Sequence, residues 1–486
     1  MSSPNRNHLI VDLFAGGGGA STGIEAALGR KVDLAINHSA TALAVHEANH
    51  PRTRHLTADL FEVDPRVATR GRRVDLLWAS PDCTHHSRAK GGKPRSQKIR
   101  SLAEVVVDWA RAVRPRVIFV ENVIEFLDWG PLDDAGYPIK SRKGETFRYW
   151  RGKLELLGYR LEHRILDSSL YGAPTRRKRL FIVARCDGEP IAWPEPTHGP
   201  GGLPLRTAAE CIDWSLPCPS IFLSPEQGRA FNVRRPLKEK TLWRIAQGIK
   251  RYVLDNPQPF LIQYNGQSGA HPAAGPLPTV TTRDRFGLVA PTLVQTGYGE
   301  RPGQAARVLD LHEPLGTVVA GGQKHALAYA LLKHYGGVVG QPLEAPTSTI
   351  TATDHHGLAA VTLAKFRGTD PSQPGWCPVD APLPTISAGG VHVAEVRALL
   401  SKHVGPEVAP VVRVGSSRFL IADIGMRMLQ PHELIRAQFG DFAEGYDLSP
   451  ARTNKAKVRL IGNSVPPNVV EALVRANLKR RETRAA

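Results

Sequence analysis

The chain has 486 residues and a formal charge of +18, because 63 Lys and Arg outnumber 45 Asp and Glu. A length of this order accommodates two or three domains. The basic excess favours a polyanionic partner, with nucleic acid first and an anionic membrane surface second. No apolar run is long enough for a membrane-spanning helix, and residues 1–8 lack the apolar core of a signal peptide.

The cysteine and histidine patterns argue against a metal site. Five cysteines, an odd count without a Cys-x-x-Cys pair, favour neither a disulfide framework nor zinc. The histidine pairs His85-His86 and His355-His356 are adjacent, which is not helical metal spacing. We therefore expect a reduced, cytoplasmic protein that holds no metal.

The first predicted elements are a strand, a glycine turn and a helix. An apolar strand at residues 8–14 runs into Gly16 to Gly19, and a helix at residues 20–28 is closed by Gly29. This order is typical of a nucleotide cradle, because glycines let backbone N–H groups approach a ligand at a helix start. A plain tight turn is an equally common meaning of a glycine run. The absence of Gly-Lys-Ser/Thr argues against a phosphate-binding P-loop.

Strands and helices then alternate to about residue 190. We expect strands at residues 32–36, 57–59, 74–79, 116–120, 160–166 and 179–184, and helices at residues 40–48, 101–113 and 146–157. Such alternation predicts parallel βαβ units in a doubly wound α/β fold. Asp12, Asp59, Cys83 and Glu121 would then lie at strand carboxyl ends, on one rim.

Cys83 begins a polar, basic loop that leaves the predicted strand at residues 74–79. Such loops carry ligands and chemistry in doubly wound folds. The Arg, Lys and His residues around Cys83 would lower its thiol pKa from the reference value of about 8.5. A lone cysteine is more often a small buried hydrophobe, so the nucleophile hypothesis depends on the flanking motifs.

Six motifs, in order, resemble those of the cytosine-C5 DNA methyltransferases. They are residues 12–19, the Cys83 loop, Glu121-Asn122-Val123, residues 171–179, Arg427-Met428-Leu429 with residues 433–439, and residues 462–467. Each motif is only moderately specific, but the ordered set is strong. The resemblance implies a Rossmann-like methyltransferase domain, discontinuous over residues 1–190 and 420–486, whose last helices pack back on the first segment.

The resemblance also implies catalytic roles. Cys83 would add to C6 of a flipped-out cytosine, and Glu121 would hydrogen-bond and protonate N3. Arg177 and Arg179 would hold the flipped base and its phosphate. The basic loop would contact DNA through Ser87, Lys90, Lys93 and Arg95.

S-adenosylmethionine is the methyl donor that the family uses. Phe14 would lie against the adenine, the glycines beneath the methionine part, and Asp59 at the adenine amino group. Asn463 and Ser464 would complete the pocket from the C-terminal segment. The full implied set is Asp12, Phe14, Gly16, Gly18, Gly19, Asn37, Asp59, Pro81, Asn463 and Ser464.

Four positions depart from the family pattern. Asp82 replaces the usual proline and Thr84 an often-present glutamine. Thr175 replaces the glutamine of the eighth motif, and Asn37 stands where a ribose-binding acid is expected. Each site residue also has a structural alternative: Asp12 and Asp59 could cap helices, and the arginines could form a solvated basic face.

The middle of the chain contains an internal repeat. After a Pro- and Gly-rich stretch near Pro190, four similar units open at Leu261, Leu293, Leu331 and Leu363, and each continues to Pro-x-x-Thr-Val/Ile. Such units predict short strands and hairpins. Residues 191–419 lie where the family carries its target-recognition domain, so we expect DNA to be read through Arg283, Arg285 and Lys324. A β-array for oligomerisation is the alternative.

The expected protein is thus a monomeric, cytoplasmic DNA cytosine-C5 methyltransferase of bacterial or phage origin. Double-stranded DNA would be its substrate and a cognate restriction endonuclease its functional partner, with no membrane association. Three alternatives remain open: action on RNA, transfer of a modified alkyl group, and a non-catalytic sequence-specific DNA-binding regulator. A binder would have no use for both Cys83 and Glu121, which argues against the third.

Overall fold

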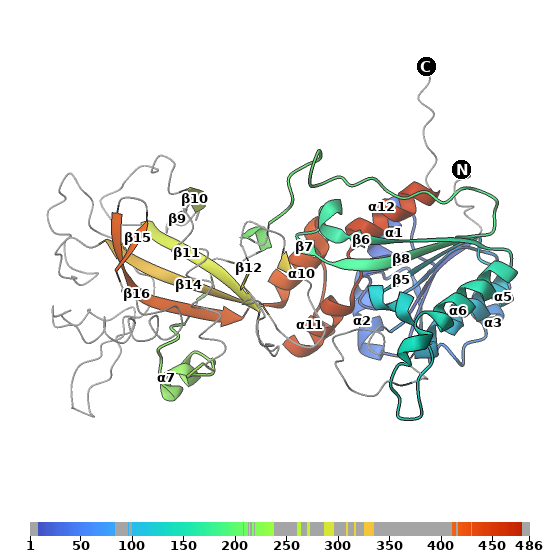
Figure 1. Ribbon diagram of the computed structural model, residues 1–486, viewed down its shortest axis with the longest axis horizontal. Helices are drawn as coiled ribbons and strands as arrows, with labels where there is room; N and C mark the ends of the chain where they lie inside the picture. Colours follow the sequence, from blue (N-terminus) through green and yellow to red (C-terminus); the bar gives the residue numbers. More distant parts are fainter. Residues whose placement is uncertain are drawn as a thin grey trace, which may run out of the picture. The chain divides into compact units, whose positions relative to one another are not determined.

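The computed structural model divides into two compact units (Figure 1). One contains Met1–Ile212, His312–Gly322 and Gln430–Ala486, and the other contains Asp213–Leu311 and Gln323–Leu429. The structure describes residues 8–82, 96, 100–207, 209–211, 213, 216–217, 219–237, 260–263, 270–272, 286–295, 308–309, 315–316, 325–334, 411–414, 417–428 and 430–478. The domain boundaries expected at residues 190 and 420 stay a prediction.

The first unit is built on a seven-stranded sheet in the order β3-β2-β1-β4-β5-β8-β6. The strands are β1 (Leu9–Leu13), β2 (Leu34–Asn37), β3 (Arg54–Thr57), β4 (Val74–Ala79), β5 (Val117–Asn122), β6 (Arg160–Asp167) and β8 (Lys178–Arg185). Strands β3 to β5 pair in parallel. The order reverses between β1 and β4, which is the topological switch point where open α/β sheets bind ligands.

The last two strands differ from the expected parallel pattern. Strand β8 is antiparallel to both β5 and β6. From β6 the chain returns through only the short helix η5 (Ser168–Tyr171) and strand β7 (Thr175–Arg176). A parallel partner would need a crossover of a dozen or more residues, so this connection allows only an antiparallel return. Strand β3 ends at Thr57, which places Asp59 in the following loop.

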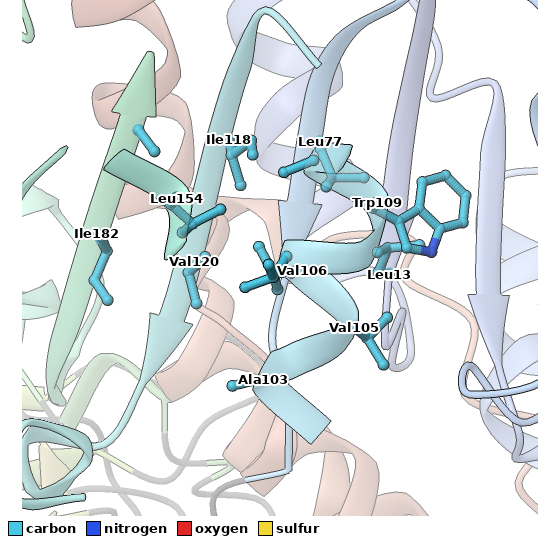
Figure 2. Close-up of a cluster of buried hydrophobic side chains, with 14 of the residues drawn as sticks. Leu13, Leu77, Ala103, Val105, Val106, Trp109, Ile118, Val120, Leu154 and Ile182 are labelled. Carbon is cyan, nitrogen blue, oxygen red and sulfur yellow. The ribbon is translucent and has the colours of Figure 1, made fainter. Parts of the chain in front are cut away.

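Helices cover both faces of the sheet. On one face lie α5 (Glu104–Val113) and α6 (Glu145–Leu156), and Figure 2 shows Trp109 and Val106 packing towards the strand residues Leu13, Leu77 and Ile118. Alternate strand residues point to the opposite face. They form a second core with α1 (Gly19–Leu28) and α12 (Pro467–Leu478). Burial on both faces explains why these strands are nearly continuous apolar runs.

Helix α12 packs unusually closely on α1. A Cβ added at Gly23 of α1 would lie 2.5 Å from the carbonyl oxygen of Pro467 and 2.6 Å from Cβ of Val470. The C-terminal helix therefore depends on glycine at this position. This contact holds α12 against α1, the helix that follows the glycine turn.

The Pro-rich stretch after Pro190 also lies along the first unit. The Ala192 N–H donates to Oδ1 of Asn477 at 3.1 Å, and Asn477 Nδ2 donates to the Ala192 carbonyl at 2.8 Å. The Tyr171 hydroxyl donates to the Pro194 carbonyl at 3.1 Å. This part of the stretch is thus tied to α12 and to the end of β6.

The second unit contains an antiparallel sheet in the order β10-β9-β11-β14-β16-β15. Its strands are β9 (Phe260–Gln263), β10 (Ala270–Pro272), β11 (Phe286–Gln295), β14 (His325–His334), β15 (Val411–Val414) and β16 (Ser417–Met428), with β12 (Val308–Leu309) beside β11. The first three predicted repeats open within β9, β11 and β14. The fourth opening at Leu363 lies outside the described residues, as do Arg283, Arg285 and Lys324.

Two absences concern only the described part of the chain. No helix there is long and apolar enough to cross a membrane. Nor do its His, Cys, Asp and Glu residues form a group of three or more that could hold a metal ion.

Candidate active site

The glycine turn lies at the carboxyl end of β1, beside the switch point. Gly18 has a φ of 107° and caps α1, which begins one residue earlier than expected. A Cβ at Gly18 would lie 2.6 Å from the Tyr446 hydroxyl and 2.8 Å from Nε2 of His50. Both the left-handed backbone and the lack of space therefore require glycine. Gly29 ends the helix in the left-handed region, as predicted.

One edge of this turn is open. A Cβ added at Gly16 would meet no atom within 4 Å. Asn37, at the end of β2, fixes the turn because its Nδ2 donates to the Ala15 carbonyl at 2.8 Å. Beyond β3, Asp59 Oδ1 accepts a hydrogen bond from the Phe61 N–H at 3.1 Å, and the Phe61 side chain is 40% exposed. The carboxyl ends of β1, β2 and β3 thus offer open backbone, an amide, and a carboxylate with an accessible ring, respectively.

Asp12 lies beneath the glycine turn and is only 2% exposed. Its Oδ2 accepts a hydrogen bond from Ser21 Oγ of α1 at 2.8 Å. Burial raises the pKa of Asp12 to about 7, against the opposing effects of the Ser21 hydrogen bond and of His50. The Asp12 carboxyl therefore links β1 to the start of α1, beneath the glycine turn.

The C-terminal segment reaches the same turn. Ser464 follows α11 (Asn454–Asn463); its Oγ donates to Leu460 O at 2.8 Å, and its carbonyl accepts from Gln438 Nε2 at 2.7 Å. A Cβ at Gly19 would clash with the carbonyl of Val465, so this segment touches the start of α1. Asn463 itself is exposed.

Glu121 is buried at the carboxyl end of β5. Its Oε1 lies 3.4 Å from Arg179 Nε. Burial raises the pKa of Glu121, and the attraction of Arg177 and Arg179 opposes this effect. Arg177 is itself buried and donates from Nη1 to the Gly462 carbonyl at 3.1 Å. A carboxyl that holds its proton more firmly than usual is suited to act as an acid.

The carboxyl ends of β4 and β5 are tied together. Asn122 Nδ2 donates to the carbonyl of the buried Pro81 at 3.1 Å. This bond holds the residue two positions before Cys83 beside the strand that carries Glu121. The predicted residues of the loop after β4 lie outside the described residues: Cys83, Ser87, Lys90, Lys93 and Arg95.

A polar cluster that the sequence motifs did not indicate lies below the turn. It contains Tyr446, whose hydroxyl donates to the Gly17 carbonyl, and three histidines, His46, His50 and His55. His46 lies in α2 (Ala40–Asn49) and His50 caps its C-terminus four residues later; this helical spacing was the signal available in the sequence.

The strand order, the glycine turn and the buried acid define a Rossmann-like α/β domain with a ligand site at its switch point. Residues 9–199 match the family model for C-5 cytosine-specific DNA methylase. Over this segment, the match confirms the predicted family resemblance.

The chain is also similar to several individual proteins. The chain is 30% identical to the type II methyltransferase M.AgeI of Thalassovita gelatinovora over 194 residues, which cover 39% of this chain and 42% of the relative. It is 24% identical to the type II methyltransferase M.AquIA of Picosynechococcus sp. over 258 residues, which cover 48% of this chain and 96% of the relative. The chain thus spans less than half the length of the first relative and nearly all of the second. A solved structure of Spodoptera frugiperda DNMT2, in a mutant form, aligns with a TM-score of 0.48 and 14% identity over 96% of this chain and 99% of its own.

Proposed function

We propose that this protein is a DNA cytosine-C5 methyltransferase that uses S-adenosylmethionine. The observation that carries the proposal is the buried Glu121, whose pKa is raised by burial and which lies beside Arg179, on the strand next to the one that leads to Cys83. The family of residues 9–199 supports it. The basic charge of +18 suits a nucleic-acid substrate.

In this proposal the protein's own residues activate C5 of cytosine, which is a poor nucleophile. The Cys83 thiolate forms a bond to C6 of the flipped cytosine, and the displaced electron pair moves towards N3. Glu121 holds a proton at N3, so the negative charge is neutralised as it develops. C5 then carries enamine character and accepts the methyl group. Loss of the C5 proton and elimination of Cys83 restore the aromatic ring and the free thiolate.

The glycine turn fits the methyl donor. The open edge at Gly16, the Asn37 amide and the half-buried Asp59 would hold S-adenosylmethionine, which supplies the methyl group when bound. Asn37 is neutral, so it can hydrogen-bond to a ribose hydroxyl without adding charge. Asn463 is exposed and free to reach the donor from the C-terminal segment.

Base-resolution mapping of cytosine modification in DNA tests the proposal. Cells that express the wild-type chain are expected to carry 5-methylcytosine at one short motif, and Cys83→Ala is expected to abolish it because no C6 adduct forms. Cys186→Ala is the matched control, since Cys186 lies at the opposite, amino-terminal side of β5 near Pro115. A mass shift other than methyl would indicate an altered donor. Modification only in RNA would overturn the DNA substrate, and full biological effect with Cys83→Ala would revive the non-catalytic regulator.

We place target recognition in residues 191–419. Replacing Arg283 and Arg285 together by alanine is expected to change the methylated motif, because side chains that contact base edges set sequence preference. The same mapping experiment measures this effect. An unchanged motif at unchanged activity would instead support the β-array for oligomerisation.

A further inference from the structure

A continuous chain of hydrogen bonds runs from the glycine turn towards solvent. It begins at Asp12, whose Oδ2 lies 2.8 Å from Ser21 Oγ. Ser21 Oγ lies 2.9 Å from His46 Nε2, and His46 Nδ1 lies 2.8 Å from Nε2 of His55. Ser21 and His46 are fully buried, whereas His55 on β3 is only half-buried. The chain therefore connects a buried carboxyl with the protein surface.

The charged and titratable groups around this chain of hydrogen bonds come from several secondary-structure elements. His50, the C-cap of α2, lies beside His46 with ring centroids 4.6 Å apart and the rings tilted by 46°. Its Nδ1 lies 3.1 Å from Glu25 Oε2 on α1. Glu47 exerts a favourable charge interaction on His55 at the outer end. The buried Tyr446 hydroxyl faces the same cluster from the C-terminal segment.

The two buried titratable groups of this hydrogen-bond chain, Asp12 and His46, have different proton affinities. Burial raises the pKa of Asp12 to about 7. Burial, together with the charges of His50 and His55, lowers the pKa of His46 well below its ordinary value, so His46 stays neutral. Near neutral pH, Asp12 is thus the group in this chain whose charge is most easily changed.

Each link can both donate and accept, so two proton arrangements satisfy the same distances. With Asp12 ionised, Ser21 donates to Asp12, His46 Nε2–H donates to Ser21, and His55 Nε2–H donates to His46 Nδ1. With Asp12 protonated, every bond is reversed and His55 carries its proton on Nδ1. Passing from the second arrangement to the first moves one proton along each bond and releases one proton from His55 Nδ1. No oxidant or other reactant is needed.

We propose that Asp12 loses a proton through Ser21, His46 and His55 when the cationic methyl donor binds at the glycine turn. The inference rests on the proposed function, because it takes S-adenosylmethionine as the ligand. The sulfonium and ammonium groups outweigh the single carboxylate of the donor, so its net charge is positive. A positive charge above the turn favours the ionised form of a carboxyl below it. Binding and deprotonation are therefore linked.

Isothermal titration calorimetry of the full chain with S-adenosylmethionine tests this linkage. In two buffers of different ionisation enthalpy at pH 7, we expect a measurable release of a fraction of one proton per donor bound. The dissociation constant is expected to be about fivefold higher at pH 6 than at pH 8, which corresponds to a fall of about one unit in the pKa of Asp12 on binding. S-adenosylhomocysteine lacks the sulfonium charge and is expected to release less.

Asp12→Asn is the decisive variant because asparagine can still accept the Ser21 hydrogen bond but cannot ionise. It is expected to remove both the proton release and the pH dependence. His163→Gln on β6, a histidine outside the chain of hydrogen bonds, is the control and should behave as the wild type. If Asp12→Asn fails to fold, Ser21→Ala replaces it. Loss of the Ser21 hydrogen bond should raise the pKa of Asp12 and move the pH dependence to higher pH.

His55→Gln tests the path separately. Glutamine can keep a hydrogen bond to His46 but cannot relay a proton, so the total release should persist while its rate, followed with a pH indicator in stopped flow, falls at least tenfold. An unchanged rate would overturn the path. Donor binding without proton release would overturn this inference alone. No donor binding at all would overturn the proposed function and this inference with it.

Discussion

Glu121→Gln is expected to lower methyl transfer by about 10²- to 10⁴-fold, the usual contribution of a positioned general acid. Glutamine has the size of glutamate but has no proton to give to N3. The chemical step should therefore slow while donor binding stays close to that of the wild type. Single-turnover transfer of a labelled methyl group to DNA measures the rate of the chemical step, and calorimetry measures donor binding.

The pH profile separates an acid role from a purely structural one. The pKa of Glu121 is raised by burial, so the protonated form persists above the ordinary range and is lost as the pH rises through the raised value. Wild-type turnover should therefore fall as the pH rises through the raised pKa of Glu121. The turnover of Glu121→Gln should not show this fall. Glu155→Gln, on the exposed face of α6, is the matched control. Turnover of Glu121→Gln within about twofold of the wild type would contradict the role.

Gly23→Ala is expected to loosen the contact between α1 and α12 at a cost of about 1–3 kcal/mol. The added methyl group would lie 2.5 Å from the Pro467 carbonyl, and backbone cannot move away as a flexible side chain can. This cost exceeds the roughly 1 kcal/mol that alanine contributes over glycine inside a helix. Faster hydrogen exchange of the α12 amides, measured by mass spectrometry, should report the change.

Gly152→Ala in α6 is the matched control for the helix effect. A Cβ at Gly152 meets nothing within 4 Å. The same substitution should therefore stabilise α6 by about 0.5–1 kcal/mol. The two Gly→Ala substitutions, both inside helices of the first unit, are thus expected to change stability in opposite directions. Equal effects would show that helix propensity, and not the close approach at Gly23, decides the outcome.

Several elements could be predicted from local chemistry. Strand β4 lies at the predicted residues, and Gly29 ends α1 as expected. The apolar runs identified strands that are buried on both faces, and glycine marked the turn that needs a left-handed residue. The carboxyl-end position of Glu121 followed from the order of strands and helices.

Other features depended on contacts between distant residues. The antiparallel direction of β8 is set by a short connection that the strand pattern alone did not reveal. The bond from Tyr446 to Gly17 joins residues 429 positions apart. Asp12 looked like a ligand contact at the end of a strand, but α1 and α2 cover it and place Ser21 and His46 at its carboxyl.

The α/β class, the family resemblance of the first segment and the candidate acid could be predicted from the amino-acid sequence, because these depend on residue type and local order. Which groups are buried together beneath the glycine turn became known only from the folded chain. Burial is the property that raises the pKa of Asp12 and of Glu121, and it arises from packing between segments far apart in the chain.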